Sequence, residues 1–409
     1  MTEQTSFTFS PAARVAGSSD SIFATMSALA AQHGAANLGQ GFPDEDGPQE
    51  MLDLAAELVH TPGKTLNQYG PGRGLEGLRA AIAEDRQRRY GHHLDPATEI
   101  VVTVGATEAL AATILAVINP GDELVALEPT YDSYPAAVTM AGGTLRQVPL
   151  RREDATEDQG EGQGWALDRE ALAAAITDKT RALLINTPHN PTGTVLGRED
   201  LEFVADLVRG TKILVITDEV YERLVFTGRH IPFATLPGMA ERTITISSAA
   251  KTFNVTGWKI GWAMGPAPLI NAVFQAKQYL SFVGATPFQP AVAWALENAG
   301  EWSDEWLETL RHRKEQLESA FAELGMDILA TAGTYFLITD ITPAFPGESA
   351  EKFCKRLPKD AGVVGIPVSP FMSPEHADQV STLVRWTFCK NQETLDTAVE
   401  RLRAFARTA

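Results

Sequence analysis

Residues 247–261 read Ser247-Ser248-Ala249-Ala250-Lys251-Thr252-Phe253-Asn254-Val255-Thr256-Gly257-Trp258-Lys259-Ile260-Gly261. They follow the apolar, β-branched run 243–246, which is typical of a buried strand. Lys251 therefore lies where a strand of an α/β sheet ends, and open sheets of this class bind ligands there. Small residues before Lys251 and aromatic residues after it favour a partly desolvated, nucleophilic amine. The stretch alone is also compatible with two ordinary surface lysines.

This stretch resembles the lysine signature of class I aminotransferases, which bind pyridoxal 5'-phosphate (PLP) on the scaffold called fold type I. The residues that carry the resemblance are Ser248, Lys251, Asn254, Gly257, Trp258, Lys259 and Gly261. In that family the lysine forms a Schiff base with the cofactor, so the resemblance gives this role to Lys251. It also implies that Ser248 and Lys259 hold the cofactor phosphate. The implied fold is α/β, with a large domain of mixed, mostly parallel sheet flanked by helices and a smaller α+β domain.

The length and composition of the chain set its organisation. With 409 residues, 44% of them hydrophobic, it can bury a large core and should divide into two domains. We expect an N-terminal arm at 1–45 that joins the small domain, a large PLP-binding domain at 46–290 and a small C-terminal domain at 291–409. The formal net charge of −18 argues against nucleic acid or an anionic membrane as the main partner.

Targeting and metal-binding signals are weak. Residues 1–6 lack the features of a signal peptide and no apolar run could span a bilayer, so we expect a cytoplasmic protein. Cys354 and Cys389 lie far apart and favour free, buried thiols over a disulfide or zinc site. The pair His92-His93 has no neighbouring ligands that suggest a metal. It is more typical of the end of a solvated helix that carries Arg86.

Two loops near the N-terminus allow alternative interpretations. The glycines and proline of 37–43 permit a tight backbone path, or a plain turn after a helix expected at 22–31. The resemblance implies that Gly41 offers its backbone to the substrate carboxylate and that Phe23 forms an aromatic wall of the pocket. Tyr69 could be a half-buried packing residue. The resemblance implies instead that Tyr69 reaches the cofactor phosphate of the neighbouring subunit, which makes the active site complete only in a homodimer.

A strand expected at 99–104 leads through small residues into a helix expected at 109–118. Free backbone N–H groups and the helix dipole at such a junction attract an anion. The signal is weak alone, and it is not the G-x-G-x-x-G pattern of dinucleotide-binding proteins. The resemblance assigns Ala106 and Thr107 to the cofactor phosphate.

Polar and aromatic residues follow the next strands. Tyr131, just past a strand at 123–127, can stack on a planar ring or fill the core, and the resemblance places it on the pyridine face. The acidic stretch 151–164 is typical of a solvated loop. Asn186 and Asn190 follow the strand expected at 180–185 and present amides at its end. The resemblance puts both near cofactor and substrate, with Asn190 bonding the ring oxygen O3' and the substrate carboxylate. His189 receives no chemical role.

Asp218 ends the apolar strand expected at 212–217. A carboxylate there is costly unless a cation meets it, and a pyridinium N–H is such a cation, although Asp218 could also cap a helix. The resemblance chooses the pyridinium and bonds Tyr221 to O3'. Phe282 matches an aromatic residue that enters the partner's pocket. Arg385 interrupts an apolar strand, which indicates either pairing with an internal carboxylate or a clamp for the substrate carboxylate. The resemblance implies the clamp.

The reaction implied is ping-pong transamination between an amino acid and a 2-oxo acid (the 2-oxoglutarate/glutamate couple), with Lys251 as general base and acid. Several segments most resemble the N-succinyldiaminopimelate aminotransferases of lysine biosynthesis, within a wider group of kynurenine, methionine and glutamine aminotransferases. A cysteine-S-conjugate β-lyase would use the same lysine. A PLP-sensing transcription regulator would need an added DNA-binding domain, and the acidic chain argues against it.

Overall fold

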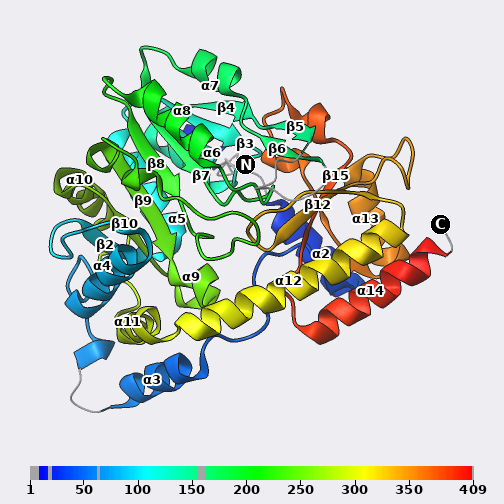
Figure 1. The fold of residues 1–409 in the computed structure, drawn as a ribbon, viewed down its shortest axis with the longest axis horizontal. Helices are drawn as coiled ribbons and strands as arrows, with labels where there is room; N and C mark the ends of the chain where they lie inside the picture. The colour runs from blue at the N-terminus through cyan, green and yellow to red at the C-terminus, as the bar shows by residue number, and fades with distance from the viewer. Residues whose placement is uncertain (1–8, 17–20, 62–64, 155–162, 408–409) are drawn as a thin grey trace, which may run out of the picture.

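The computed structural model describes residues 9–16, 21–61, 65–154 and 163–407. Two sheets organise these residues, and the long helix α12 (Gly300–Glu323) runs from the side of the larger sheet to the side of the smaller one (Figure 1). The larger sheet has the order β2-β10-β9-β8-β7-β3-β4. Its strands are β2 (Ile100–Val104), β3 (Glu123–Glu128), β4 (Thr144–Pro149), β7 (Thr180–Asn186), β8 (Leu214–Asp218), β9 (Thr243–Ser248) and β10 (Ile260–Met264).

The pairing within this sheet is mostly parallel. Only β10 runs antiparallel to its neighbours β2 and β9, whereas the pairs from β9 to β4 are parallel. The mixed, mostly parallel sheet predicted from the sequence is confirmed. Because parallel strands are covered on both faces, their residues are nearly all buried.

Alternate residues of each strand enter different hydrophobic clusters. Leu184 packs with the helices of one face, and its neighbour Leu183 packs with those of the other. The first face carries α5 (Gly105–Val117), α6 (Ser133–Ala141) and α10 (Ala267–Lys277). The second carries α3 (Gln49–His60), α4 (Glu76–Tyr90), α7 (Arg169–Ala175), α8 (Arg198–Val208) and α11 (Gln289–Asn298).

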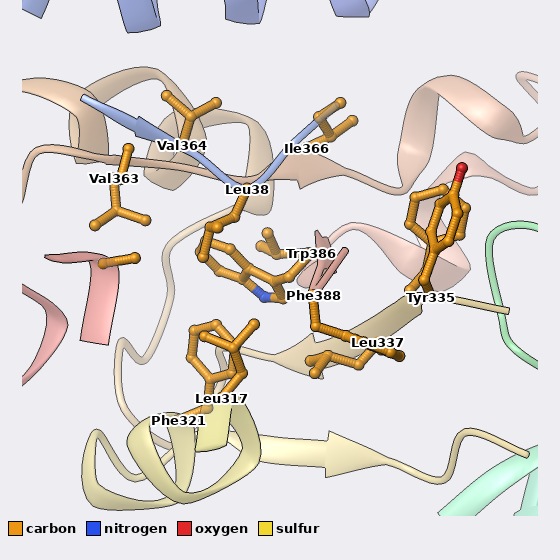
Figure 2. Close-up of a cluster of buried hydrophobic side chains, with 14 of the residues drawn as sticks. Leu38, Leu317, Phe321, Tyr335, Leu337, Val363, Val364, Ile366, Trp386 and Phe388 are labelled. Carbon is orange, nitrogen blue, oxygen red and sulfur yellow. The ribbon is translucent and has the colours of Figure 1, made fainter. Parts of the chain in front are cut away.

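The smaller sheet is antiparallel, with the order β11-β12-β15-β14. Its strands are β11 (Asp327–Leu329), β12 (Phe336–Asp340), β14 (Ile366–Pro367) and β15 (Leu383–Thr387), and the helices α12, α13 (Ala350–Asp360) and α14 (Gln392–Ala406) accompany it. Figure 2 shows the core between them, where the rings of Phe321 and Trp386 lie 4.6 Å apart. Cys354 and Cys389 are free and buried here, as predicted.

The N-terminal segment lies on this smaller sheet. It contains α1 (Ala13–Ala16), α2 (Ile22–His33) and the short strand β1 (Ala36–Asn37), which pairs in parallel with β13 (Val363–Val364). Ser21 caps α2 by accepting a hydrogen bond from the Ala24 amide. Leu38 belongs to the same buried cluster as Trp386 (Figure 2). This pairing brings the loop that contains Gly41 back over the larger sheet.

Two local predictions are wrong. The segment 151–164 is not a loop at its ends, because β5 (Arg151–Asp154) and β6 (Gln163–Ala166) form an antiparallel pair, while 155–162 lie outside the described residues. Its charge concealed the strands: Arg152 pairs with Asp340, and Trp165 is buried. The helix carrying Arg86 ends at Tyr90, and Arg86 is buried rather than solvated because it meets two acidic residues. Within the described ranges, no helix is both long and apolar enough to cross a membrane.

Candidate active site

A cavity of about 350 Å³ lies at the carboxyl ends of β7, β8 and β9. Asn186, Asp218 and Ser248 are the last residues of these three strands and all line it. The predicted site residues that line the cavity are Phe23, Gly41, Ala106, Thr107, Tyr131, Asn186, Asn190, Asp218, Tyr221, Ser248, Lys251, Lys259 and Arg385. Parallel strands thus bring together residues that are far apart in the sequence.

Tyr69 and Phe282 do not line this cavity. Their rings contact each other at 5.4 Å, and they are 83% and 50% exposed. Tyr279 and Leu280 beside them are 85% and 51% exposed. These four residues form what we call the aromatic projection. Its position agrees with a role outside the chain's own cavity, which the resemblance implies.

Lys251 enters the cavity from the short helix α9 (Ala249–Thr252). Its Nζ donates a 3.1 Å hydrogen bond to the Gly41 carbonyl, which also accepts from the Tyr335 hydroxyl at 2.6 Å. Among the described residues it forms no ion pair within 4 Å. Burial lowers the pKa of Lys251 to about 8, so a substantial fraction of the amine is neutral near physiological pH.

Asp218 is a buried acid that forms no ion pair with any residue in the described ranges. It is 4% exposed, and its Oδ2 accepts a 2.7 Å hydrogen bond from the Tyr134 hydroxyl. The Val220 amide donates a longer bond of 3.3 Å to Oδ1. Burial raises the pKa of Asp218 to about 6 in spite of these donors. A protonated ring nitrogen placed in the cavity would supply the missing cation.

The register of β10 builds the opposite end of the cavity. Ile260 pairs with Val104, the last residue of β2, and Gly261 pairs with Ser248. The first turn of α5 therefore lies against β10, so closely that a Cβ on Gly261 would be 2.6 Å from the Ala106 nitrogen. Only glycine fits there.

The helix α5 begins at Gly105, earlier than the sequence predicted, so Ala106 and Thr107 form its first turn. Their free N–H groups face the cavity end where Ser248 and Lys259 lie. A Cβ on Gly105 would be 3.1 Å from Lys259 Nζ, which places this ammonium beside the helix start. Within the described part of the chain, Lys259 has no acidic partner. A helix N-terminus, a hydroxyl and an unpaired cation together suit a phosphate.

Arg385 reaches the cavity from the middle of β15 and is 1% exposed. Its guanidinium donates to the Asn190 side-chain oxygen at 3.1 Å and to the Gly39 carbonyl at 2.8 Å, while Nε has no acceptor. No carboxylate lies within ion-pair distance of it among the described residues. Burial lowers the pKa of Arg385 to about 10. The alternative of an internal salt bridge thus finds no partner, and the group is free for an incoming carboxylate.

The asparagines and aromatic residues shape the cavity between these groups. Asn186 donates to the Asp218 carbonyl at 2.9 Å and accepts from the Asn190 amide at 2.7 Å, which fixes the loop that carries Asn190. Burial raises the pKa of Tyr221, so its hydroxyl keeps its proton. Phe23 packs against the Arg385 guanidinium at 5.2 Å. His189 bonds Thr192 and is held neutral, with its pKa lowered by burial to about 3.

Sequence reasoning missed Tyr134, Tyr335 and Phe336, which contact Asp218, Gly41 and Arg385 respectively. In the sequence, Tyr134 and Tyr335 look like ordinary core tyrosines, and the structure shows that both are in fact buried. Only the neighbourhood of Tyr131 singled out the segment that contains Tyr134.

A buried charge cluster behind Asp218 was also missed. Glu219 and Glu222 accept hydrogen bonds from Arg86 at 3.1 and 2.5 Å, and His230 lies 3.0 Å from Glu219. The two glutamates and the histidine offer ligand atoms close enough together to hold a metal ion. However, Arg86 already pairs with both carboxylates. Burial opposes the charge of Arg86, but Glu222 and Glu219 raise its pKa above its ordinary value. The cluster therefore ties α4 to the segment that follows β8.

Three groups in the cavity match the chemical groups of PLP. Among the described residues, Asp218 has no cation and Lys259 no anion in contact with it, and the partly neutral amine of Lys251 can bond an aldehyde. Residues on this chain thus fit the ring nitrogen, the phosphate and the carbonyl of the cofactor. The fit rests on this arrangement of charges and free donors.

Comparisons with known proteins agree with the geometry. The family model for class I and II aminotransferases matches residues 34–402. A probable N-succinyldiaminopimelate aminotransferase of Mycobacterium tuberculosis is 51% identical over 392 residues, covering 94% of this chain and 96% of the relative. A kynurenine–oxoglutarate transaminase of Dictyostelium discoideum is 37% identical over 421 residues, covering 97% and 96%.

The solved structure of an N-succinyldiaminopimelate aminotransferase from Mycobacterium tuberculosis superposes with a TM-score of 0.91 at 49% identity, covering 97% of this chain and 100% of that one. The family resemblance and the fold predicted from the lysine stretch are both confirmed. Sheet order, cavity and overall similarity lead to one conclusion: this chain belongs to the class I and II aminotransferases, and it is a PLP-dependent transaminase of fold type I.

Proposed function

We propose that this enzyme transfers the amino group of N-succinyl-LL-diaminopimelate to 2-oxoglutarate, as a cytoplasmic homodimer in lysine biosynthesis. The observation that carries the substrate assignment is the 51% identity, over nearly the whole chain, to a protein described as a probable N-succinyldiaminopimelate aminotransferase. The charges in the cavity support the reaction type independently of that likeness.

Arg385 binds the α-carboxylate of the amino acid or 2-oxo acid in this proposal. Its two terminal nitrogens can meet both carboxylate oxygens, and the buried Nε has no other acceptor. Asn190 is hydrogen-bonded to Arg385 and would donate its amide nitrogen to the same carboxylate or to the ring hydroxyl. Because Arg385 is buried and Asn190 is half-buried, binding excludes water from the carbon that reacts.

Seven residues would hold the cofactor in the cavity. Asp218 would hold the protonated ring nitrogen, Tyr131 would stack on the ring, and Tyr221 would bond the ring hydroxyl. Ser248, Lys259, Ala106 and Thr107 would hold the phosphate. When bound, PLP supplies an electron-withdrawing ring that stabilises negative charge at the substrate α-carbon.

Lys251 would carry the cofactor at rest and move the proton during the reaction. With a pKa lowered to about 8, its amine can take a proton from the substrate α-carbon and return it at the neighbouring position. Each half-reaction exchanges an amino acid for a 2-oxo acid, so the kinetics are ping-pong.

The homodimer is proposed from the aromatic projection. Its four large apolar residues (Tyr69, Tyr279, Leu280 and Phe282) are at least half exposed. The rings of Tyr69 and Phe282 are in contact, and Tyr279 and Leu280 shortly precede Phe282 in the sequence. Such a surface usually marks a contact. A second copy of the chain would bury them and receive Tyr69 and Phe282 at its cavity. The cofactor phosphate and the substrate pocket of one subunit would then be completed by the other.

We also propose the division into an arm at 1–45, a large domain at 46–290 and a small domain at 291–409. The arm pairs with β13, and the Thr387 amide donates to the Leu38 carbonyl, which supports joining it to the small sheet.

The substrate assignment can be tested by half-reactions. The PLP form is mixed with N-succinyl-LL-diaminopimelate, kynurenine or methionine, and the loss of the visible cofactor band is followed. We expect the first donor to react with the highest kcat/KM. Absence of turnover with it would disprove the substrate assignment, and release of pyruvate and ammonia from a cysteine conjugate without any 2-oxo acid would favour a β-lyase.

A further inference from the structure

Lys277 is buried in a way that the proposed reaction does not explain. It is the last residue of α10 and only 1% exposed, yet no carboxylate pairs with it among the described residues. Its ammonium instead donates to two carbonyl oxygens, that of Phe282 at 2.6 Å and that of Gly72 at 3.2 Å. Glu108 acts on the Lys277 ammonium only at a distance, and an ammonium without a carboxylate in contact is costly to bury, so the two carbonyl bonds matter to the local structure.

The two carbonyls belong to segments that are far apart in the sequence. Gly72 lies in the loop that carries Tyr69, and Phe282 lies in the loop after α10. Gln289 joins the same two loops a second time, since its side chain accepts from the Leu75 amide and donates to the Gly284 carbonyl, both at 2.8 Å. Gln289 is also 1% exposed. Two buried side chains therefore cross-link the loops.

The outcome of this cross-link is a fixed ring pair. Tyr69 and Phe282 meet edge to face, with 5.4 Å between centroids and 75° between planes. Phe282 adopts a φ of +61°, a left-handed conformation that is rare and strained for an aromatic residue. The carbonyl of this strained residue is the one that Lys277 binds at 2.6 Å. Lys277 thus stabilises the backbone that aims Phe282, and with it Tyr69, outward.

We propose that Lys277 is a positioning residue for the partner subunit's active site, acting through the Tyr69–Phe282 pair that it holds in place. This inference rests on the shared site proposed above. Burying the Lys277 ammonium destabilises one subunit, and the ring pair that it positions serves the active site of the other subunit. If Lys277 served only to end α10, its substitution would instead weaken PLP binding in its own subunit's cavity, or in neither cavity of the dimer.

Mixed dimers distinguish these roles. One chain keeps Lys251 and the other carries Lys251→Ala, with a different affinity tag on each, so that only one site can bond PLP. Lys277→Met is placed on the Lys251→Ala chain (trans arrangement) or on the Lys251 chain (cis arrangement). Cofactor-free dimers are titrated with PLP, reduced with borohydride, and the modified Lys251 is counted by mass spectrometry.

We expect the dissociation constant for PLP to rise about tenfold in the trans arrangement and to stay unchanged in cis. A tenfold rise corresponds to the loss of one well-placed hydrogen bond to a charged group, here the bond proposed between Tyr69 and the cofactor phosphate. An equal effect in both arrangements, an effect only in cis, or none in either would overturn the proposal. Loss of the mixed dimer itself would assign Lys277 to assembly and also overturn it. If the Lys277→Met chain does not fold, Lys277→Gln replaces it with the same expectations.

Two controls separate this inference from the proposed function. Lys355→Met removes an exposed lysine on α13 and should change nothing in either arrangement. Tyr69→Phe on the Lys251→Ala chain should weaken PLP binding at the intact site. If Tyr69→Phe has no effect, the shared site is wrong. If Tyr69→Phe weakens binding but Lys277→Met in trans does not, only the role of Lys277 is wrong.

Discussion

The hydroxyl of Tyr134 donates a 2.7 Å hydrogen bond to Asp218 Oδ2, and both side chains are buried. Tyr134 comes from α6 and Asp218 from the end of β8, so the bond joins a helix to the strand that it covers. This bond and the longer one from the Val220 amide compensate the buried carboxylate only in part, which is why burial still raises the pKa of Asp218 to about 6. This imbalance has a measurable effect on stability.

The cofactor-free protein should lose stability as Asp218 ionises. Its carboxyl has a pKa of about 6 in the folded chain, against an ordinary value of 3.8. Its contribution is therefore full below about pH 4 and is lost as the pH rises through about 6, by roughly 3 kcal/mol in total. Asp218→Asn cannot ionise. Its free energy of unfolding, measured in urea, should therefore rise relative to that of the wild type as the pH increases across this range. Parallel pH profiles for the two proteins would contradict the prediction.

The amine of Lys251 should titrate early in the cofactor-free protein. Burial lowers its pKa to about 8 from 10.5, and the positive charge of Arg385 contributes. Acylation of Lys251, followed by mass spectrometry, should therefore reach half its maximal rate near pH 8. Arg385→Gln should move this midpoint upward. A wild-type midpoint near 10.5 would show that the amine is solvated.

Arg385→Lys should impair both half-reactions while leaving the cofactor in place. Lysine offers a point charge without the two parallel donors of the guanidinium, and the half-buried Asn190 oxygen loses its partner. We expect kcat/KM to fall about a hundredfold or more for amino donors and 2-oxo acids alike. The visible cofactor band measures loading, and Arg356→Lys on α13, remote from the cavity, serves as the matched control. Equal losses in cofactor binding would contradict a substrate role.

Removing Arg86 should destabilise the fold strongly. Arg86→Met leaves Glu219 and Glu222 buried without their cation, which costs about 3–5 kcal/mol in the free energy of unfolding. Arg88→Met on the same helix removes a half-exposed partner of Asp85 and should cost less than about 1 kcal/mol. Chemical denaturation at neutral pH gives both values. Recovery of stability when Glu219→Gln and Glu222→Gln are added would identify the uncompensated charges as the cause.

The sequence predicted five of the seven strands of the large sheet, because a buried parallel strand leaves a run of apolar residues that ends abruptly in a polar one, but it missed β4 and the antiparallel β10. Asn186 and Asp218 were found in this way. The sequence could not predict which side chains from distant segments come into contact in the folded chain. Tyr134 and Tyr131 look equivalent in the sequence, yet only Tyr134 reaches Asp218. Arg86 belongs to a helix with the composition of a solvated one, and nothing local indicated that Glu219 would meet it.

The same limit applies to the lysines. Lys251 stood out because a strand precedes it, whereas Lys277 lies at an ordinary helix end and its two carbonyl partners come from separate loops. The short strands β5 and β6 were missed because acidic residues dominate the segment between them. Local patterns report burial and periodicity, and they are silent about contacts between distant segments.

The reversal of β10 fixes the distance between Ser248 and Lys259 by main-chain pairing, since Gly261 faces Ser248 and Ile260 faces Val104 in the ladder. The anion-holding end of the cavity is therefore a property of the backbone scaffold. Substitutions in the walls around Phe23 and Gln40 would leave this main-chain pairing in place, so the cavity can be reshaped on that side without moving Ser248 relative to Lys259.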